Sequence, residues 1–182
     1  MMKTKTVAVV ILFLVFLVGC KPETSKRITE DASNPHDSIF KVGVTALVTV
    51  NDTFSLYYAL DGRNNFTKIK PLWAPVKGKA QAQEILFQLP PKTIPNQLRI
   101  DLGRNANQKD IFIKKITMKY NAKVFEAQGT LIFSYFRPDF KKTEFDATTG
   151  LIRGIVTDGL RQSPSLYPKE GPLSKQIKLL TE

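Results

Sequence analysis

The chain has 182 residues, and its 27 basic residues against 16 acidic ones give a formal charge of +11. This length suits one domain with a sizeable core, and the charge favours anionic partners such as acidic polysaccharide, lipopolysaccharide phosphate or lipid headgroups. A solvated basic surface without a specific partner is the alternative. The chain has one cysteine and one histidine, too few for a disulfide framework or for a zinc site built on these residues.

The first twenty residues have the order of an export signal. Lys3 and Lys5 precede an apolar run at 7–18, and the small residue Gly19 stands before Cys20. A charged segment, a short apolar segment and a small residue at the cleavage point are the parts of a signal peptide. The apolar run is shorter than the roughly 20 residues that a transmembrane helix needs.

The sequence Leu-Val-Gly-Cys at 17–20 resembles the lipobox of bacterial lipoproteins. This resemblance implies that the signal peptide at 1–19 is removed and that Cys20 is acylated. It predicts a lipoprotein anchored in the membrane of the bacterial cell envelope, on a periplasmic or surface face. The outer membrane is favoured because Lys21 stands where an aspartate would resemble an inner-membrane retention signal. An ordinary secreted protein and an uncleaved membrane anchor are the alternatives.

Residues 20–38 form a polar segment after the signal. They include Pro22, Pro35 and charges of both signs. Because such a composition cannot bury an apolar core, we expect a flexible tether between the lipid and the domain. His36, the histidine of this chain, falls in this tether.

A period of two begins after the tether. Alternate residues are hydrophobic over 40–50 and again over 54–60, with an Asn-Asp turn between them. This pattern is typical of strands with one buried face. Further strands are predicted at 83–89, 98–102 and 111–120.

The strand at 111–120 changes phase. Its apolar residues occupy odd positions before Lys114 and even positions after Lys115. A β-bulge at this slip would keep both halves of the strand facing the core.

The remaining segments up to residue 172 show no helical period of ordinary length. Residues 66–80 are broken by prolines and predict irregular structure or a short edge strand. Residues 131–136 are apolar on both parities, which predicts a central strand, and residues 143–157 predict a hairpin. Residues 159–172 contain three prolines and predict a loop.

Many short strands separated by turn signals predict an all-β fold, an antiparallel β-sandwich of jelly-roll type over 39–170. Leu173, Ile177 and Leu180 fall at helical spacing. They predict a short C-terminal helix, or a frayed tail, at 171–182.

Between residues 66 and 120, an aromatic loop is followed by the segments GKAQAQEILFQLP, QLRIDLG and DIFIKKITMKY. This succession resembles jelly-roll sandwiches of the carbohydrate-binding-module and galactose-binding type, which occur beside cell-surface polysaccharide enzymes. The resemblance implies a sandwich fold. It also implies glycan binding on a concave face or in end loops, or a role as a structural spacer.

Four residues are candidates for ligand binding. Trp73 lies between two prolines, where it either offers a platform to a sugar ring or plugs one end of the sandwich. Tyr57 has the opposite parity to the core residues of its strand, which predicts exposure. Arg99 and Asp101 share one face of a strand, where they either hydrogen-bond sugar hydroxyls or pair with one another.

The predicted function is non-catalytic: a lipoprotein whose sandwich binds, or is associated with, envelope glycans. One alternative is a structural or assembly lipoprotein that contacts another envelope protein. Another is a small glycan-active enzyme, which would need only two carboxylates. We expect no cofactor, no metal and no nucleic-acid partner, because no motif for any of them occurs.

Overall fold

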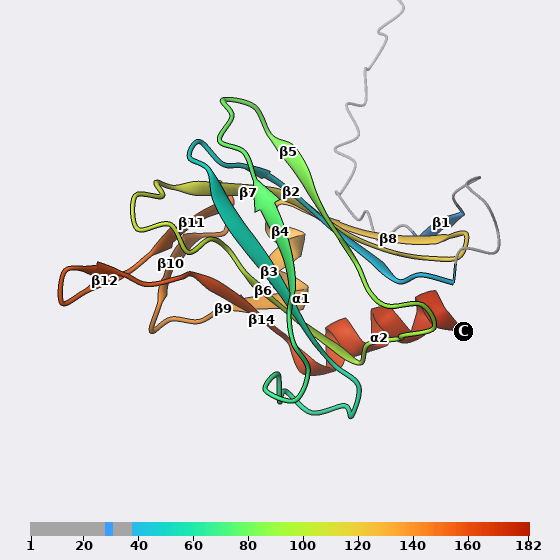
Figure 1. Cartoon of the computed structure of the whole chain (residues 1–182). Coiled ribbons are helices and arrows are strands. Elements are labelled where there is room, and N and C mark those ends of the chain that lie inside the picture. Colours follow the sequence, from blue (N-terminus) through green and yellow to red (C-terminus); the bar gives the residue numbers. More distant parts are fainter. Residues whose placement is uncertain (1–27, 31–37) are drawn as a thin grey trace, which may run out of the picture.

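The computed structural model describes residues 28–30 and 38–182, which form two antiparallel sheets packed face to face (Figure 1). The predicted all-β sandwich is therefore confirmed. The predicted signal peptide, Cys20 and most of the predicted tether lie outside the described residues.

The first sheet, sheet A, is centred on one long strand. Its strands are β1 (Ile28–Glu30), β2 (Lys41–Leu47), β5 (Gln83–Gln88), β7 (Ile111–Tyr120), β8 (Lys123–Gln128), β10 (Thr143–Asp146) and β11 (Leu151–Gly154). Strand β7 pairs with β2, which pairs with β5. It also pairs with β8 and β11, which lead outward to β1 and β10.

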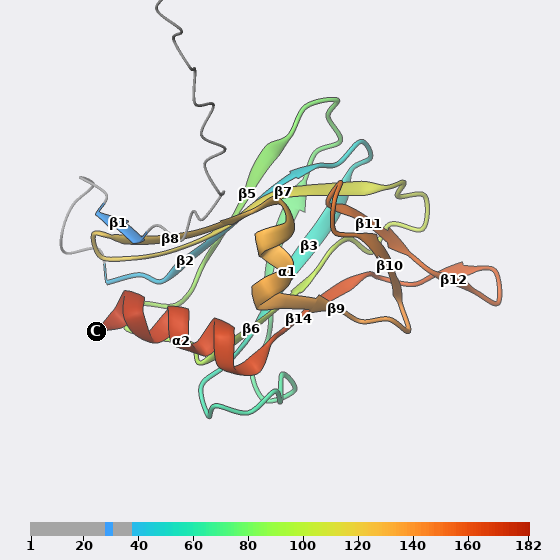
Figure 2. The same cartoon turned by 180° about the vertical axis from the view of Figure 1, so that it is seen from behind.

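The second sheet, sheet B, has the strand order β4-β3-β6-β14-β9. Its strands are β3 (Asp52–Ala59), β4 (Leu72–Val76), β6 (Gln97–Asp101), β9 (Phe136–Pro138) and β14 (Ser165–Pro168). Strands β12 (Val156–Thr157) and β13 (Leu160–Arg161) form a small hairpin of their own, which projects from one end of the sandwich in Figure 2.

The core lies between the sheets and follows the period of two. Strand β2 belongs to sheet A and the next strand, β3, belongs to sheet B. In each of them alternate residues point inward, toward the other sheet. Their inward side chains at Val42, Val44, Phe54 and Leu56 are fully buried, as is Phe40 just before β2. The predicted strands at 83–89 and 98–102 contribute buried residues in the same way.

The predicted bulge is confirmed. Lys115 pairs with Thr45 and Ile113 pairs with Ala46, so Lys114 is the extra residue and points to solvent. The extra residue restores the phase, because apolar side chains on both sides of it remain buried.

Two segment predictions were wrong. Residues 131–136 do not form a central strand. The 3₁₀ turn Gly129–Leu131 leads into helix α1 (Ile132–Tyr135), and only Phe136 begins a strand. A short apolar run does not distinguish a buried strand from a buried helical turn, and Ile132 and Tyr135 are buried at a helical spacing of three.

The predicted loop at 159–172 contains strand β13, the start of helix α2 and β14, an internal strand of sheet B. Pro164 precedes this strand and Pro168 is its last residue, so neither proline removes a hydrogen bond from its middle.

Other expectations hold. Strand β4 is an edge strand within 66–80, and β10 and β11 form the predicted hairpin. Helix α2 (Glu170–Thr181) confirms the C-terminal helix, with Leu173, Ile177 and Leu180 buried. One expectation holds only in part, because the predicted flexible tether at 20–38 includes the short strand β1, which pairs with Lys123–Phe125 of β8.

Candidate functional site

The outer face of sheet B carries a row of aromatic and basic side chains. Tyr57 of β3 lies opposite Arg99 of β6, and Tyr167 of β14 lies opposite Arg137 of β9. Strand β14 pairs with β6 through Leu166 and Ile100, which places Tyr167 beside Arg99. Segments more than 100 residues apart therefore build one row.

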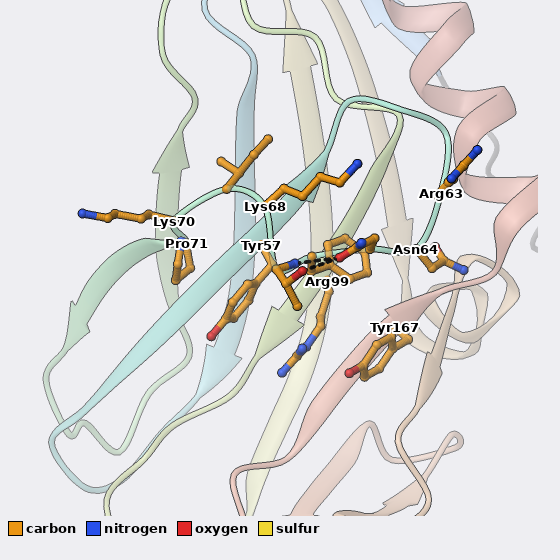
Figure 3. A pocket seen from close by; sticks show the side chains of 12 residues that line it. Tyr57, Arg63, Asn64, Lys68, Lys70, Pro71, Arg99 and Tyr167 are labelled. Atoms are coloured by element: carbon orange, nitrogen blue, oxygen red, sulfur yellow. Dashed lines mark hydrogen bonds between the residues drawn. The ribbon is translucent and has the colours of Figure 1, made fainter.

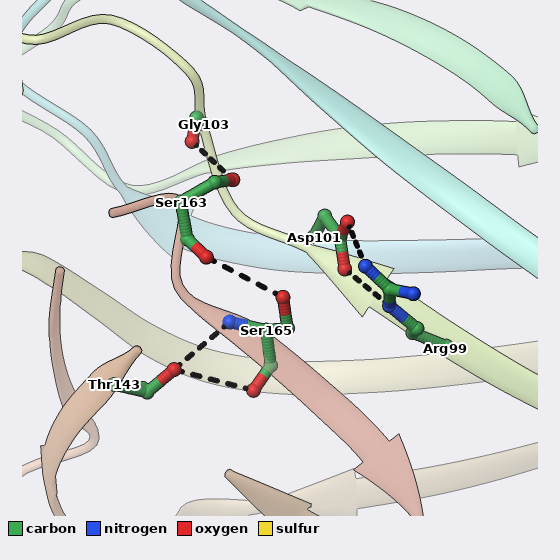
Figure 4. A network of polar contacts seen from close by, with 6 residues as sticks. All are labelled: Arg99, Asp101, Gly103, Thr143, Ser163 and Ser165. Carbon is green, nitrogen blue, oxygen red and sulfur yellow. Dashed lines mark hydrogen bonds and ion pairs between the residues drawn. The ribbon is translucent and has the colours of Figure 1, made fainter. Parts of the chain in front are cut away.

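Arg99 is held by three neighbouring side chains. Its guanidinium carbon lies 4.5 Å from the ring centroid of Tyr57 and 4.8 Å from that of Tyr167. Its Nε and Nη2 donate hydrogen bonds of 2.8 and 2.6 Å to the carboxylate of Asp101, as Figure 4 shows. Burial acts to lower the pKa of Arg99, but the hydrogen bonds and charge of Asp101 outweigh it, and the pKa is raised. Arg99 is therefore a permanent cation in a fixed position.

Tyr167 is packed as firmly as Arg99. The guanidinium of Arg137 lies 5.4 Å from its ring centroid, and Phe66 meets the ring edge-on at 6.1 Å. Further along β14, the backbone N–H of Ser165 donates to the Thr143 hydroxyl at 3.0 Å, which ties this strand to β10 (Figure 4). The ring of Tyr167 is thus packed between two guanidinium groups.

A groove of about 890 Å³ opens beside this row (Figure 3). Sheet B supplies its floor through Tyr57, Arg99 and Tyr167, and the segment 63–71 supplies its wall. The wall side chains are Arg63, Asn64, Asn65, Phe66, Thr67, Lys68, Ile69, Lys70 and Pro71.

The wall is anchored at several points. The Oδ1 atom of Asp61 accepts a hydrogen bond from the backbone N–H of Arg63, and its Oδ2 pairs with Lys68 at 3.1 Å. The hydrogen bond from Lys68 is the main reason that the pKa of Asp61 is lowered. Asn64 donates a hydrogen bond to Glu170 at the start of α2. The contacts of Asp61 lie within the loop itself, and the hydrogen bond from Asn64 ties the loop to α2.

The groove is positively charged. Arg63, Lys68, Lys70 and Arg99 line it, and none of its lining residues is a carboxylate. Lys68 and Arg99 are paired with Asp61 and with Asp101, respectively. Arg63 and Lys70 are exposed and form no ion pair with any residue that the structure describes.

Trp73 lies in a separate hollow of about 530 Å³ on β4. The side chain is 48% exposed, so the alternative that it plugs the sandwich is wrong. The guanidinium of Arg104 lies 5.3 Å from its ring centroid. Asp52 holds the neighbouring loop by accepting hydrogen bonds from the backbone N–H groups of Arg104 and Asn105.

The structure divides the four candidate residues. Tyr57 and Arg99 meet in the groove, and Asp101 adjoins Arg99 as its ion-pair partner within the same strand. Trp73 lines the other hollow. The sequence reasoning missed Tyr167, because the alternation around Leu166 is too short to predict a strand between two prolines. It also missed Arg63 and Lys70, which no pattern singles out.

Three further observations bear on the chemistry of the chain. Among the described residues, no group of three His, Cys, Asp or Glu side chains could hold a metal ion. No helix in the described part of the chain is long and apolar enough to cross a membrane. No family model, curated protein or solved structure matches this chain.

Proposed function

We propose that this protein is a lipoprotein of the bacterial cell envelope whose sandwich binds glycan in the groove of sheet B. The observation that carries this proposal is the row Tyr57–Arg99–Tyr167 at the floor of an open groove. The anchor is Cys20, through the lipobox-like sequence at 17–20.

The groove offers both kinds of contact that a sugar needs. Sugar rings present apolar C–H faces and polar hydroxyl edges. Tyr57, Ile69 and Pro71 give apolar surface, while the tyrosine hydroxyls and the side chains of Asn65 and Thr67 give hydrogen-bonding groups. A small number of fixed polar groups on a mostly apolar surface is typical of small-molecule sites.

The row is also preorganised. Asp101 and the two tyrosine rings fix the guanidinium of Arg99 before any ligand arrives. Groups that are already fixed lose little conformational entropy on binding, and this favours affinity.

The test is a glycan array followed by titration of the glycans that bind. Tyr57→Ala should weaken binding at least tenfold, because it removes the apolar floor while the inner face of β3 stays intact. The matched control is Trp73→Ala, which removes an aromatic side chain from the other hollow and should change affinity less than twofold. If no glycan binds to the wild-type protein, the glycan proposal fails.

The anchor has its own test. Cys20→Ser should release the protein from membranes, because two acyl chains give stable anchoring and each buried CH₂ contributes about 0.8 kcal/mol. If this variant still sediments with membranes after a high-salt wash, the lipoprotein proposal is wrong.

A second candidate function is assembly with another envelope protein. It is favoured by the projecting β12–β13 hairpin, where Val156 is 65% exposed and Leu160 is 68% exposed. A photo-crosslinker at Val156 in intact cells should then capture one defined protein, whereas one at Lys109 should not. Equal labelling from both positions would count against assembly through this hairpin.

A further inference from the structure

The positive charge available to a ligand in the groove comes from the wall segment 63–71 and not from Arg99 of sheet B. Asp101 binds one edge of the Arg99 guanidinium, and the Tyr57 and Tyr167 rings lie over it. Its charge is thus largely compensated inside the protein. Lys68 is paired with Asp61. The uncompensated charge belongs to Arg63 and Lys70 of the wall.

These two cations lie toward opposite ends of the groove. In Figure 3, Lys70 extends beside Pro71 on the side of Tyr57, and Arg63 extends beside Asn64 on the side of Tyr167 and helix α2. The tyrosines and Arg99 lie between them. A ligand that engages both cations therefore lies along the floor between them.

We infer that the groove takes a stretch of acidic polysaccharide, with anionic groups at two separated points along the chain. This inference rests on the proposed glycan binding and names the class of glycan. Arg63 and Lys70 each bind one anionic group, and the unit between them lies over Tyr57. The anionic group is a carboxylate or a phosphate, since both cations accept either.

Single-stranded nucleic acid is the other polyanion with rings, but the floor suits it less well. Base binding uses exposed aromatic faces on which successive bases stack. Tyr167 has Arg99 and Arg137 against its ring, and Tyr57 has Arg99 against its own. Two guanidinium groups therefore cover the ring of Tyr167 and one covers that of Tyr57, so the row keeps a ring face for stacking on Tyr57 only. One ring face suits a single sugar ring and not a series of stacked bases.

The experiment measures binding of the full chain to five ligands by titration at low salt. They are galacturonic acid, its hexamer, phosphomannan, the neutral maltohexaose and a single-stranded DNA hexamer. The hexamer should bind at least tenfold more tightly than the monomer, because only the hexamer engages both ends. Its affinity should fall as salt rises toward 1 M, where the Debye length is about 3 Å. If phosphomannan binds more tightly than the hexamer, the anionic group is a phosphate, and this result supports the inference equally.

Paired variants locate the charges. Arg63→Gln and Lys70→Gln should each weaken hexamer binding about two- to fivefold, as expected for exposed ion pairs, and together about tenfold or more. The matched control is the double variant Lys109→Gln and Lys141→Gln, which removes the same charge from exposed positions outside the groove and should change affinity less than twofold.

The failures of the two proposals differ. If both double variants weaken binding equally, the overall charge acts and the inference is wrong, although Tyr57→Ala still tests the groove. If maltohexaose binds as well as the hexamer, the groove binds glycan but does not select charge. If a DNA hexamer binds more tightly than the acidic hexasaccharide, the ligand class is wrong.

Discussion

The two sheets of the sandwich have similar inner faces and different outer faces. The inner faces of both sheets carry aliphatic and aromatic side chains, which pack into one core. Outside, sheet A carries solvated pairs such as Lys115 with Glu126 at 2.9 Å, and its hollow at Gly43 is about 170 Å³. The outer face of sheet B carries two hollows of about 890 and 530 Å³.

The difference arises from the loops. The segment 61–71 leaves β3 and rises over sheet B, where Phe66 and Asn64 attach it to Tyr167 and α2. A second loop, at 103–107, is held by Asp52 beside Trp73. The hollow of sheet A at Gly43 is instead lined only by residues of strands β2, β5 and β7, without a loop beside it. The proposed glycan binding therefore places the ligand on the outer face of sheet B, beside the fixed segment 61–71.

The largest expected effect comes from the register of sheet A. Deleting Lys114 would shift one half of β7 by one residue relative to its partner strands. The apolar side chains of that half would then turn from the core to solvent, because a slip of one residue reverses the face of every side chain that follows. We expect the deletion variant to show no cooperative thermal transition. The control Lys114→Thr keeps the bulge and should unfold within a few degrees of wild type. Similar unfolding temperatures for both variants would contradict the bulge as the source of register.

A smaller effect is expected from the ion pair of sheet B. The side chains of Arg99 and Asp101 are 18% and 12% exposed, so Arg99→Ala leaves a mostly buried carboxylate without its partner. Removing one partner of a buried pair costs about 3–5 kcal/mol. For a protein of this size we expect the melting temperature to fall by roughly 6–20 °C.

Sheet A offers a matched pair for this test. Arg153 also donates two hydrogen bonds to one carboxylate, Asp110, at 2.6 Å each, but its side chain is 49% exposed. Arg153→Ala should therefore cost at most about 1 kcal/mol. If both arginine variants lower the melting temperature equally, burial is not what distinguishes the two pairs.

The inner faces were predictable because burial imposes a period of two that a single strand displays. The bulge at Lys114 was predictable for the same reason, since the phase of the apolar residues changes there. The groove was predictable only in part. Tyr57 and Arg99 could be placed on outer faces by parity, but their proximity to Tyr167 depends on the pairing of β14 with β6, which no local pattern specifies.

Trp73 gives a still smaller expected change in stability. It lies on an edge strand and is 48% exposed, so Trp73→Ala should lower the melting temperature by only a few degrees. Arg104 should then lose its aromatic neighbour while the loop stays bound to Asp52. A drop as large as that of Arg99→Ala would mean that the second hollow is a structural element.

The smallest expected effect is one of pH. Hydrogen bonds from Arg153 lower the pKa of Asp110 below its usual value of 3.8. The unfolded chain therefore binds more protons in acid, and the contribution of Asp110 to stability is present above pH 3.8 and is lost as the pH falls through the lower folded-state pKa. Asp110→Asn should reduce the difference in melting temperature between pH 7 and pH 2.5. An unchanged difference would assign the acid sensitivity to other carboxyl groups.

The assignment of function to one face of sheet B is tested most directly by amide hydrogen exchange of the full chain with and without a glycan that it binds. We predict slower exchange in the wall segment 61–71, because ligand in the groove covers it. The backbone amides of the loop at 103–107 and of the strands of sheet A should exchange at the same rates with and without the glycan. Protection of the 103–107 loop alone, or of sheet A, with the wall unchanged, would contradict the account.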